Sequence, residues 1–599
     1  MNILIFFVIW EILWYVPIPP ARFRPLSSRR LLSLTIGLFL FGMNVLAATP
    51  LSSFVYFLIF SRLFVAIGEI FVSAIPFAFE QVEKNFRLSQ FPSLRISLNR
   101  KRKIMGAVLV AIFLVSLLGM IVFNETQRVS NASYFNSFIQ QSSDLPFSNT
   151  IPDNMVRLVT KELAVSIARR HMSEFGSNTQ VLDCHITKSP KGKLAWVAAI
   201  GSTNIIAENY VKGFVVVDAN EPAAAPEIVH TEFNVGVGLW WDRNIPLRNY
   251  MADISKRYGV SYLTWDRESA EPIYVVTRYE FGFDLIRRYA TPLAYDSQGT
   301  LMNEPKDLSE IPDWMSQVYD EDWMESMVNE MGGLRRGEGF DYFSGGFLWI
   351  IAPSRDRFEM TEDTRYIVDP ETEEVVALIC VNPIGNQRTL SGVFKASRKG
   401  VVFHDFKTLN YISGMTAEDL TEGRLPKPAT GNYYAVMPLL YSVEVSPGNF
   451  RLGWYVPVYW YEGSSEFDED ETVYLAGFAI VDAQDTNKIA LTINEEGITS
   501  EQMVRKTRID FLKLFGEGEE TTVEVTANVL NSYSYVQEGL THIVLHLDNT
   551  TYPWIEATPA DLSADEWNQL MAVEQGQEIF AAIEKNEARW LITQFENHG

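Results

Sequence analysis

The stretch "THIVLHLD" (541–548) contains two histidines, a residue type that commonly binds metal ions, on one strand. Alternation along a β-strand places His542, His546 and Asp548 on one face of that strand. Along an extended strand the two histidines are about 13 Å apart, which is too far for them to share one metal ion. We therefore interpret this stretch as a solvated sheet face.

A run of carboxylates offers a second chemical possibility. The stretch "FDEDE" contains four consecutive acidic residues, Asp468, Glu469, Asp470 and Glu471. Clustered carboxylate oxygens could hold Ca²⁺, although this spacing matches no EF-hand loop. An exposed hairpin tip is the favoured interpretation because charge runs are normally solvated.

The common catalytic signatures are missing from the sequence. It contains no G-x-S-x-G nucleophile elbow, no H-E-x-x-H zinc motif, no P-loop, no Rossmann glycine fingerprint and no cysteine pair at zinc spacing. The two cysteines, Cys184 and Cys380, could form one disulfide or remain two buried free thiols. We expect a protein that is not an enzyme and has no cofactor other than the Ca²⁺ alternative. A hydrolase with an unfamiliar active site remains the enzymatic alternative.

The charge of the chain is divided between its two parts. Residues 1–123 contain 12 Lys and Arg against 4 Asp and Glu, whereas the whole chain contains 50 against 74, so residues 124–599 carry a net charge of −32. Such an acidic region repels phosphate backbones, which makes nucleic acid a poor partner.

Four apolar runs in residues 1–123 predict transmembrane helices, near 2–18, 31–48, 51–75 and 104–123. Basic residues cluster in the connections after the first and third runs, which places those connections in the cytoplasm. The sequence thus predicts a multi-pass protein of the cell membrane, with its N-terminus and its large C-terminal region outside the cytoplasm. The sequons at Asn124, Asn131 and Asn549 are then candidate glycosylation sites.

Three ionisable residues fall inside the predicted membrane helices. Arg62 and Glu69 are two helical turns apart and share one helix face, which Glu11 could approach from the first run. Charged groups at membrane depth are costly unless they are paired. We favour an ion pair that fixes helix packing over a transport path, because the four runs offer little other polar lining.

One phrase occurs twice in the C-terminal region. "YVKGFVVVDANE" (210–221) and "YLAGFAIVDAQD" (474–485) are identical at six of twelve positions, and "KLAW" or "RLGW" precedes each copy. A weaker copy is "GFLWIIAPS" (346–354) with "RYIVDPETEEVVAL" (365–378). Such similarity indicates a duplicated supersecondary unit. The aspartates Asp218, Asp369 and Asp482 end each strand and are expected to cap the backbone of their own turns.

These units resemble PepSY-type domains. The resemblance is carried by the predicted helix 155–176, the paired strands, and the endings "GFVVVDANEP" and "RYIVDPETEEVV". It implies small helix-plus-sheet modules outside the cytoplasm that regulate or inhibit other envelope proteins. It brings no catalytic residues, and only the first copy has an obvious preceding helix.

The complete prediction is an α+β fold in which a bundle of about four transmembrane helices precedes a large extracytoplasmic region of duplicated helix-plus-antiparallel-sheet units. Its parts are a membrane region (1–123), a linker (124–154), a first unit (155–300), a middle unit (301–400), a repeated unit (401–515), and C-terminal strands with a helical tail (516–599).

We expect an interaction or assembly protein, an accessory subunit of an envelope or cell-surface complex. Its partners would be other membrane or envelope proteins, further copies of itself, and the lipid bilayer. The aromatic residues Trp240, Trp241, Trp454 and Trp460 are the candidate contact residues because tryptophan dominates interface hot spots. A transporter or channel component that uses the intramembrane Arg and Glu residues is the alternative.

Overall fold

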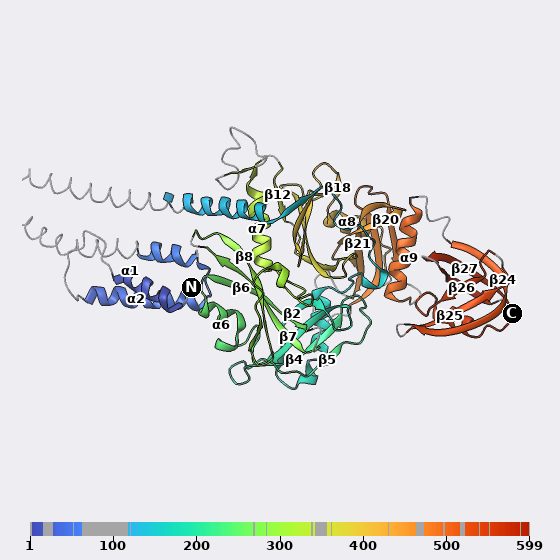
Figure 1. The fold of residues 1–599 in the computed structure, drawn as a ribbon, viewed down its shortest axis with the longest axis horizontal. Coiled ribbons are helices and arrows are strands. Elements are labelled where there is room, and N and C mark those ends of the chain that lie inside the picture. The colour runs from blue at the N-terminus through green and yellow to red at the C-terminus, as the bar shows by residue number, and fades with distance from the viewer. Residues whose placement is uncertain are drawn as a thin grey trace, which may run out of the picture.

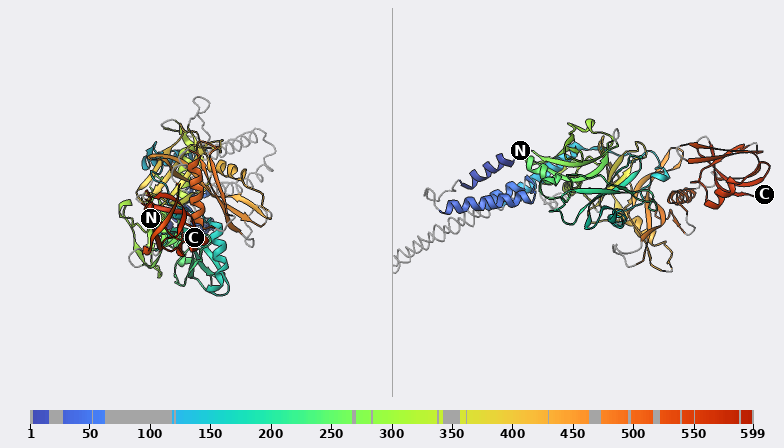
Figure 2. Two further views of the ribbon diagram at one scale, coloured as in Figure 1. Left: turned by 90° about the vertical axis from the view of Figure 1, so that its right-hand side faces the viewer. Right: turned by 90° about the horizontal axis from the view of Figure 1, so that it is seen from below.

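The structure is a computed structural model of the 599-residue chain. It describes residues 3–15, 28–51, 53–62, 118–119 and 121–597, except for 267–269, 283, 337–338, 342–355, 361, 429, 463–472, 495–497, 516–521, 538–539, 550 and 587–588. The N-terminal helices lie at one end of its long axis and a C-terminal barrel lies at the other, as Figure 1 and Figure 2 show.

Three units repeat one arrangement, a helix followed by a four-stranded antiparallel meander, to whose sheet unit three adds a fifth strand, β19 (Asn432–Ala435). Unit one contains α5 (Lys161–Arg170), β2 (Thr179–Lys188), β3 (Leu194–Ser202), β4 (Val211–Asp218) and β5 (Glu227–Val229). Unit two contains α6 (Ile245–Ala252), β6 (Lys256–Trp265), β7 (Pro272–Phe281), β8 (Arg287–Tyr295) and β9 (Leu301–Asn303). Unit three contains α8 (Gly414–Glu422), β20 (Leu439–Ser446), β21 (Asn449–Tyr461), β22 (Val473–Asp482) and β23 (Ile489–Ile493). The two copies of the repeated phrase form β4 and β22, the third strands of units one and three.

The aspartate of the repeated phrase caps the turn after its strand. Asp218 Oδ1 accepts hydrogen bonds from the backbone N–H groups two and three residues further on, at 2.8 and 3.2 Å. Asp482 Oδ1 makes the same two contacts at 2.7 and 2.6 Å, and Asp369 accepts from the residue two positions on at 2.9 Å. The predicted capping role of these aspartates is confirmed. In unit two, Asp296 caps the turn after β8 in the same way, at 2.9 and 2.7 Å.

Units one and three share a tryptophan contact in addition to the capped turn. Trp196 on β3 donates its ring N–H to the carbonyl of Val159 at 2.9 Å, and Trp454 on β21 donates to the carbonyl of Ile412 at 3.0 Å. In each unit the next residue, a threonine or a serine, caps the helix through its hydroxyl oxygen. Unit three therefore also has a preceding helix, α8, which the sequence pattern had not revealed.

The helix predicted over residues 155–176 is shorter in the structure. Residues 156–160 are extended, because the N–H groups of Leu158 and Val159 both donate to the carbonyl of Ala219, at 2.8 and 2.9 Å. The helix α5 then begins after the cap of Thr160. This extended segment, 156–160, lies against the turn that Asp218 caps.

A fourth sheet differs in topology from the meander units. Its strand order is β1 (Gln140–Ser142), β17 (Gly400–Asp405), β16 (Gly392–Ser397), β14 (Val375–Pro383) and β12 (Phe358–Met360), and β13 (Arg365–Val368) also pairs with β14. The helix α7 (Glu321–Leu334) contacts β12. The phrase "RYIVDPETEEVVAL" forms the β13–β14 hairpin, whereas the preceding "GFLWIIAPS" (346–354) lies outside the described residues.

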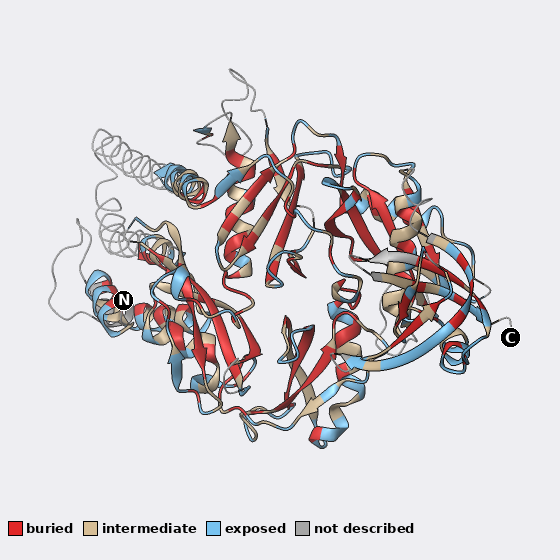
Figure 3. Ribbon diagram, turned by 45° about the vertical axis from the view of Figure 1, so that its right-hand side comes forward, coloured by how far each residue is buried: buried red, intermediate tan, exposed pale blue. Residues whose placement is uncertain are grey.

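Two large apolar cores lie between these sheets. Alternate residues of unit one face opposite cores, so Trp196 and Ala198 belong to the core shared with unit three, while Val197 and Ala199 belong to the core shared with unit two. Figure 3 shows buried residues along the strands of successive sheets. The remaining short elements and the helix α9 complete this region: η1 (Asp153–Met155), η2 (Met172–Phe175), η3 (Trp241–Arg243), η4 (Leu308–Glu310), β10 (Arg335–Arg336), β11 (Gly339–Phe340), β15 (Thr389–Leu390), β18 (Tyr411–Ile412), β19 (Asn432–Ala435) and α9 (Ser500–Lys513).

The N-terminal region corrects the membrane prediction. Among the described residues, no helix has both the length and the apolar content that crossing a bilayer requires. The helix α1 (Ile3–Tyr15) has 13 residues and is about 20 Å long, against a hydrocarbon core of about 30 Å. The helix α2 (Ser28–Leu46) begins with the polar and charged residues Ser-Arg-Arg, so its apolar part is shorter than the whole helix. This finding overturns the predicted bundle of four transmembrane helices, and with it the multi-pass cell-membrane localisation.

The other two predicted membrane runs are only partly described. Residues 53–62 and 121–138 are helical, whereas 63–75 and most of 104–123 lie outside the described residues. Where the N-terminal helices are described, they pack on one another. Trp10 donates its ring N–H to the carbonyl of Gly37 at 2.8 Å, and the Phe54 ring lies 5.0 Å from that of Trp10.

The C-terminal region forms a closed five-stranded barrel with its own apolar core. Its elements are β24 (Thr522–Gln537), β25 (Leu540–Leu547), β26 (Trp554–Ala557), α10 (Ala564–Met571), β27 (Glu578–Asn586) and β28 (Arg589–Asn597). The predicted helical tail is wrong beyond α10. Ile579, Ala581 and Ile583 are buried at every second position, which is a strand period.

Candidate functional site

A large cavity lies where unit one, α7, the fourth sheet and unit three meet. We call it the junction cavity, and its volume is about 390 Å³. Such a volume lies within the range of about 300–1,000 Å³ that ligand pockets occupy. Its lining residues are Arg157, Thr160, Lys161, Glu162, His185, Ile186, Trp196, Gln317, Glu321, Asp363, Thr364, Arg365, Tyr366, Val436, Met437 and Tyr461.

Arg157 anchors the basic side of the junction cavity. It belongs to the extended segment 156–160 and is almost fully buried, with its guanidinium carbon 4.9 Å from the centre of the Trp196 ring. One of its terminal N–H groups donates to the carbonyl of Tyr366 at 2.9 Å. Burial, together with the nearby Arg365, lowers the pKa of Arg157 to about 9. Arg157 thus ties unit one to the fourth sheet across the floor of the cavity.

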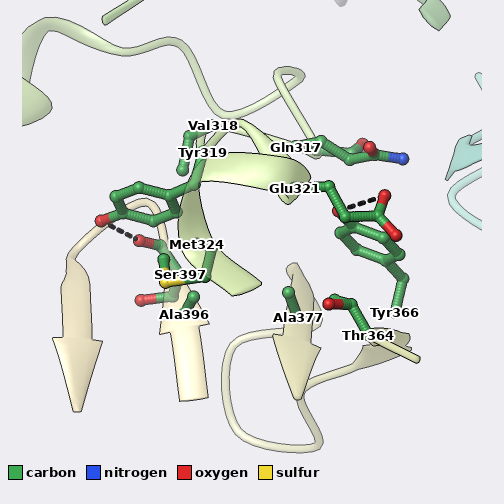
Figure 4. Close-up of a pocket in the computed structure, with 11 residues that line it drawn as sticks. Gln317, Val318, Tyr319, Glu321, Met324, Thr364, Tyr366, Ala377, Ala396 and Ser397 are labelled. Carbon is green, nitrogen blue, oxygen red and sulfur yellow. Dashed lines mark hydrogen bonds between the residues drawn. The ribbon is translucent and has the colours of Figure 1, made fainter. Parts of the chain in front are cut away.

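Glu321 forms the opposing acidic side. It is the first residue of α7, where the helix N-terminus favours a carboxylate. The Tyr366 hydroxyl lies 3.4 Å from Glu321 Oε2, as drawn in Figure 4. Burial, with the neighbouring Glu325, raises the pKa of Glu321. The cavity therefore presents cationic and carboxyl groups within one enclosure.

A smaller hollow of about 10 Å³ adjoins the junction cavity and shares four of its lining residues. This is close to the volume that one water molecule needs. Figure 4 shows Tyr319 and Ser397 on its far side, where the Tyr319 hydroxyl donates to the Ser397 carbonyl at 3.1 Å. Glu321 and Tyr366 separate this hollow from the larger cavity.

Two polar atoms of the cavity lining are buried and make no hydrogen bond to any described residue: Gln317 Oε1 and Arg365 Nε. The amide nitrogen of Gln317 donates to the carbonyl of Ile186 at 2.7 Å, and this contact fixes the side chain. Buried polar atoms are paired in the great majority of cases, so the wall of the cavity holds one acceptor and one donor whose hydrogen-bonding capacity is unused.

The hydroxyl and imidazole groups of the lining each have a side-chain or backbone partner. The two lining threonines are engaged elsewhere: the hydroxyl oxygen of Thr160 caps α5, and the Thr364 hydroxyl donates to Glu325 at 2.9 Å. His185 is held by Asp183, with 2.8 Å between Nε2 and Oδ1. In the part of the chain that the structure describes, no group of three His, Cys, Asp or Glu side chains could hold a metal ion.

A cluster of carboxyl groups lies at the start of α8. Glu362 Oε1 accepts a hydrogen bond from the Met415 N–H in the first turn of that helix, at 3.1 Å. Burial raises the pKa of Glu362, and burial together with the neighbouring Glu362 raises the pKa of Glu418 to about 7. Arg365 opposes both shifts, so this cluster and the junction cavity share one cation.

The four tryptophans predicted as contact residues differ in their surroundings. Trp240 and Trp241 are exposed, by 56 % and 49 %. Trp454 is buried in the core and bonds to the backbone before α8. Trp460 is half-buried, bonds to the carbonyl of Thr430 and stacks on Tyr474 with 5.1 Å between ring centres.

The remaining predicted residues fall in separate places. Cys184 and Cys380 are buried free thiols, on β2 and β14, and burial raises the pKa of Cys184 to about 12. Arg62 is buried, donates to the carbonyl of Leu13 at 3.3 Å and lies over the Trp14 ring. Both carboxylate oxygens of Glu11 are buried without a hydrogen-bond partner among the described residues. Glu69 and the acidic run Asp468, Glu469, Asp470 and Glu471 lie outside the described residues.

The three sequons also differ in exposure. Asn124 is exposed on the helix 121–138. Asn131 is buried and bonds to Glu330 Oε2 and to the Arg287 N–H, both at 3.0 Å, so a glycan cannot be attached to it in this conformation. The side-chain oxygen of Asn549 accepts backbone hydrogen bonds within its own turn.

Comparison with known proteins gives this chain no family. No protein-family model matches it. No curated protein matches it either. The function of the chain is therefore inferred from the geometry described above.

Sequence reasoning missed the lining of the junction cavity. Its charged members come from separate segments. Arg157 falls in the predicted helix 155–176 and Arg365 begins "RYIVDPETEEVVAL", but neither pattern indicates that the two residues meet around one cavity with Glu321. One available signal was the arginine directly preceding the repeated unit, which stands in an apolar stretch, "MVRLV".

Proposed function

We propose that the chain is a non-enzymatic binding protein whose junction cavity accepts a polar, charged segment of a partner protein. The observation that carries this proposal is a cavity of about 390 Å³ whose lining brings charged side chains of both signs, Arg157, Arg365 and Glu321 among them, around one space. A peptide segment supplies both the donors and the acceptors that such a lining requires. The chain would act as an accessory or assembly subunit.

The construction of the site supports a rigid receptor. Arg157 and Glu321 are held by contacts to the backbone or hydroxyl of Tyr366, so little side-chain freedom is lost when a guest enters. The acidic chain disfavours nucleic acid as that guest. A role in binding other proteins also agrees with the resemblance of the repeated units to PepSY-type domains.

Site-directed photo-crosslinking tests this proposal. Val436 lines the cavity and is partly exposed, so a benzoylphenylalanine at this position should crosslink to one discrete partner peptide in the source cells. The same probe at Ile206, which is 80 % exposed, serves as the surface control. We expect the crosslink from position 436 alone.

A matched pair of arginine variants makes the result specific. Arg365→Met removes the positive charge and the unpaired Nε–H donor of the guanidinium from the cavity wall but retains an apolar chain of similar length. This variant should abolish the crosslink. Arg288→Met removes a surface arginine that pairs with Asp284, and it should leave the crosslink intact. Identical crosslinks from positions 436 and 206, or a crosslink that survives Arg365→Met in a folded protein, would refute the proposal. Hydrolytic turnover that is lost in Glu321→Gln would instead establish an enzyme.

A further inference from the structure

The C-terminal barrel has a specific topology. Its strands close in the order β24-β25-β26-β28-β27, and the contact between β26 and β28 is parallel while the other pairings are antiparallel. The helix α10 lies in the chain between the third and fourth strands of the barrel. A five-stranded Greek-key barrel with this order is the OB-fold, a fold in which the face of strands two and three binds chains of nucleotides or sugars. A fold alone does not assign a ligand, so the class of ligand is inferred from the residues on that face.

Aromatic rings cover the outer face of β24, β25 and β26. Trp554 and Tyr533 are each 49 % exposed, and their ring centres are 6.3 Å apart. His546, the cross-strand neighbour of Trp554 on β25, stacks on it with 3.9 Å between ring centres, so one ring face of Trp554 is held against the barrel. We call these three residues, together with Tyr535 and His542, the aromatic face.

The second half of the aromatic face is fixed by one carboxylate. Tyr535 and His542 stack on each other at 4.8 Å, and both contact Glu556 Oε1 at 2.6 Å. Glu556 is only 6 % exposed. Because these rings are held before any ligand arrives, binding costs little conformational entropy.

Charge decides between the ligand classes that such a barrel accepts. Residues 522–597 contain 12 Asp and Glu against 2 Lys and Arg, a net charge of −10, which repels a phosphate backbone. The carboxylate within the aromatic face, Glu556, is already bonded to Tyr535 and His542, so it is not presented to a cationic peptide. A neutral ligand with flat apolar surfaces and hydroxyl groups remains. The C–H faces of pyranose rings carry partial positive charge and suit the negative faces of aromatic rings.

We propose that the aromatic face of the barrel binds a neutral oligosaccharide or polysaccharide. Sugar rings stack on Trp554 and Tyr533. The exposed side chain of Asn531, which shares the face of Tyr533 on β24, provides a donor and an acceptor for sugar hydroxyl groups. This site is independent of the junction cavity.

Calorimetric titration of the full chain tests the proposal. The probes are a panel of neutral hexasaccharides with β-1,4, β-1,3 and α-1,4 linkages, together with dT12 and an octalysine peptide. We expect saturable binding of at least one hexasaccharide and none of dT12 or octalysine. Absence of binding across the sugar panel, or binding of dT12 or octalysine alone, overturns the proposal.

Variants locate the binding on the barrel. Trp554→Ala and Tyr533→Ala should each weaken sugar affinity by about 5- to 100-fold, the range seen when one stacking ring is removed. Trp554→Phe retains a ring face and should keep most of the affinity. Trp240→Ala removes a similarly exposed tryptophan from outside the barrel and should change nothing. Because both target side chains are half exposed, the variants are expected to fold, which circular dichroism checks. Unchanged affinity in both alanine variants, or lost affinity in Trp240→Ala, overturns the proposal.

Discussion

The aspartates of the two phrase copies make the same turn contacts, yet we expect their removal to have unequal consequences. Asp482 is fully buried and lies 2.8 Å from the Nε atom of Arg451. Asp218 is 19 % exposed in its side chain, and its partner Lys193 is 3.4 Å away and 57 % exposed. Both aspartates make the turn contacts, but only Asp482 has a buried carboxylate in its ion pair. The same substitution at the two positions therefore distinguishes the effect of the turn contacts from the effect of the buried ion pair.

The expected magnitudes follow from these surroundings. Asp218→Ala loses two backbone hydrogen bonds, at about 0.5–1.5 kcal/mol each, and a surface ion pair worth about 0–1 kcal/mol, which we take as about 2 kcal/mol together. Asp482→Ala also removes the carboxylate that pairs with Arg451, and breaking a buried pair costs about 3–5 kcal/mol. Because Arg451 is 30 % exposed, we expect about 4 kcal/mol in total for Asp482→Ala.

Hydrogen exchange read by mass spectrometry measures both turns within one chain. A protein of this size does not unfold in two states, so local exchange is the appropriate observable. Since 1.4 kcal/mol is a factor of ten, amides after β4 should exchange roughly 30-fold faster in Asp218→Ala, and those after β22 roughly 700-fold faster in Asp482→Ala. Asp482→Asn keeps the turn acceptor without the charge and should fall between the two. Equal acceleration in the two alanine variants would refute the argument from burial.

Three further predictions concern buried groups. Because burial raises the thiol pKa of Cys184 to about 12 and that of Cys380 well above its usual value, neither should react with iodoacetamide at pH 8 until the chain is denatured; rapid labelling of the native protein would contradict this. Burial raises the pKa of Glu418 from 4.5 to about 7, so its protonation stabilises the fold fully below about pH 4.5 and this contribution is lost as the pH rises through about 7. Glu418→Gln should slow amide exchange in α8, relative to the intrinsic rate, at pH 8 and leave it nearly unchanged at pH 4, and equal changes at both pH values would argue against the assignment. Arg157→Met keeps an apolar contact with Trp196 but leaves the carbonyl of Tyr366 without its donor, so local stability should fall by about 1–3 kcal/mol, measured as faster amide exchange in residues 156–160.

Local sequence patterns predicted the individual strands and the repeated unit well, because a strand, its turn and its capping aspartate lie within about twenty residues. The repeated phrase forms β4 and β22, and "RYIVDPETEEVVAL" forms the β13–β14 hairpin. Unit two was missed because it shares the arrangement of the other units without sharing their phrase.

Long-range arrangements were not predictable in this way. The apolar N-terminal runs matched the composition of membrane spans, but α1 is too short and buries Phe6 and Trp10 against α2 and Phe54. The last residues satisfied a loose helical period, yet they close a barrel whose pairing partners start more than 50 residues earlier. The lining of the junction cavity comes from seven separate segments, so no single stretch of sequence carries its signal.

The extended segment 156–160 links parts of the chain that are made at very different times. Leu158 receives a hydrogen bond at 2.6 Å from the hydroxyl of Tyr459, which is 301 residues further along the chain. At a synthesis rate of about 5–20 residues per second, Tyr459 emerges roughly 15–60 s after Leu158. During that interval the face of unit one that will meet unit three has no partner, and its apolar residues, Trp196 and Ile200 among them, remain open to wrong contacts. Completion of unit one therefore waits for translation of unit three, and a ribosome stalled between the two should release a chain that chaperones retain.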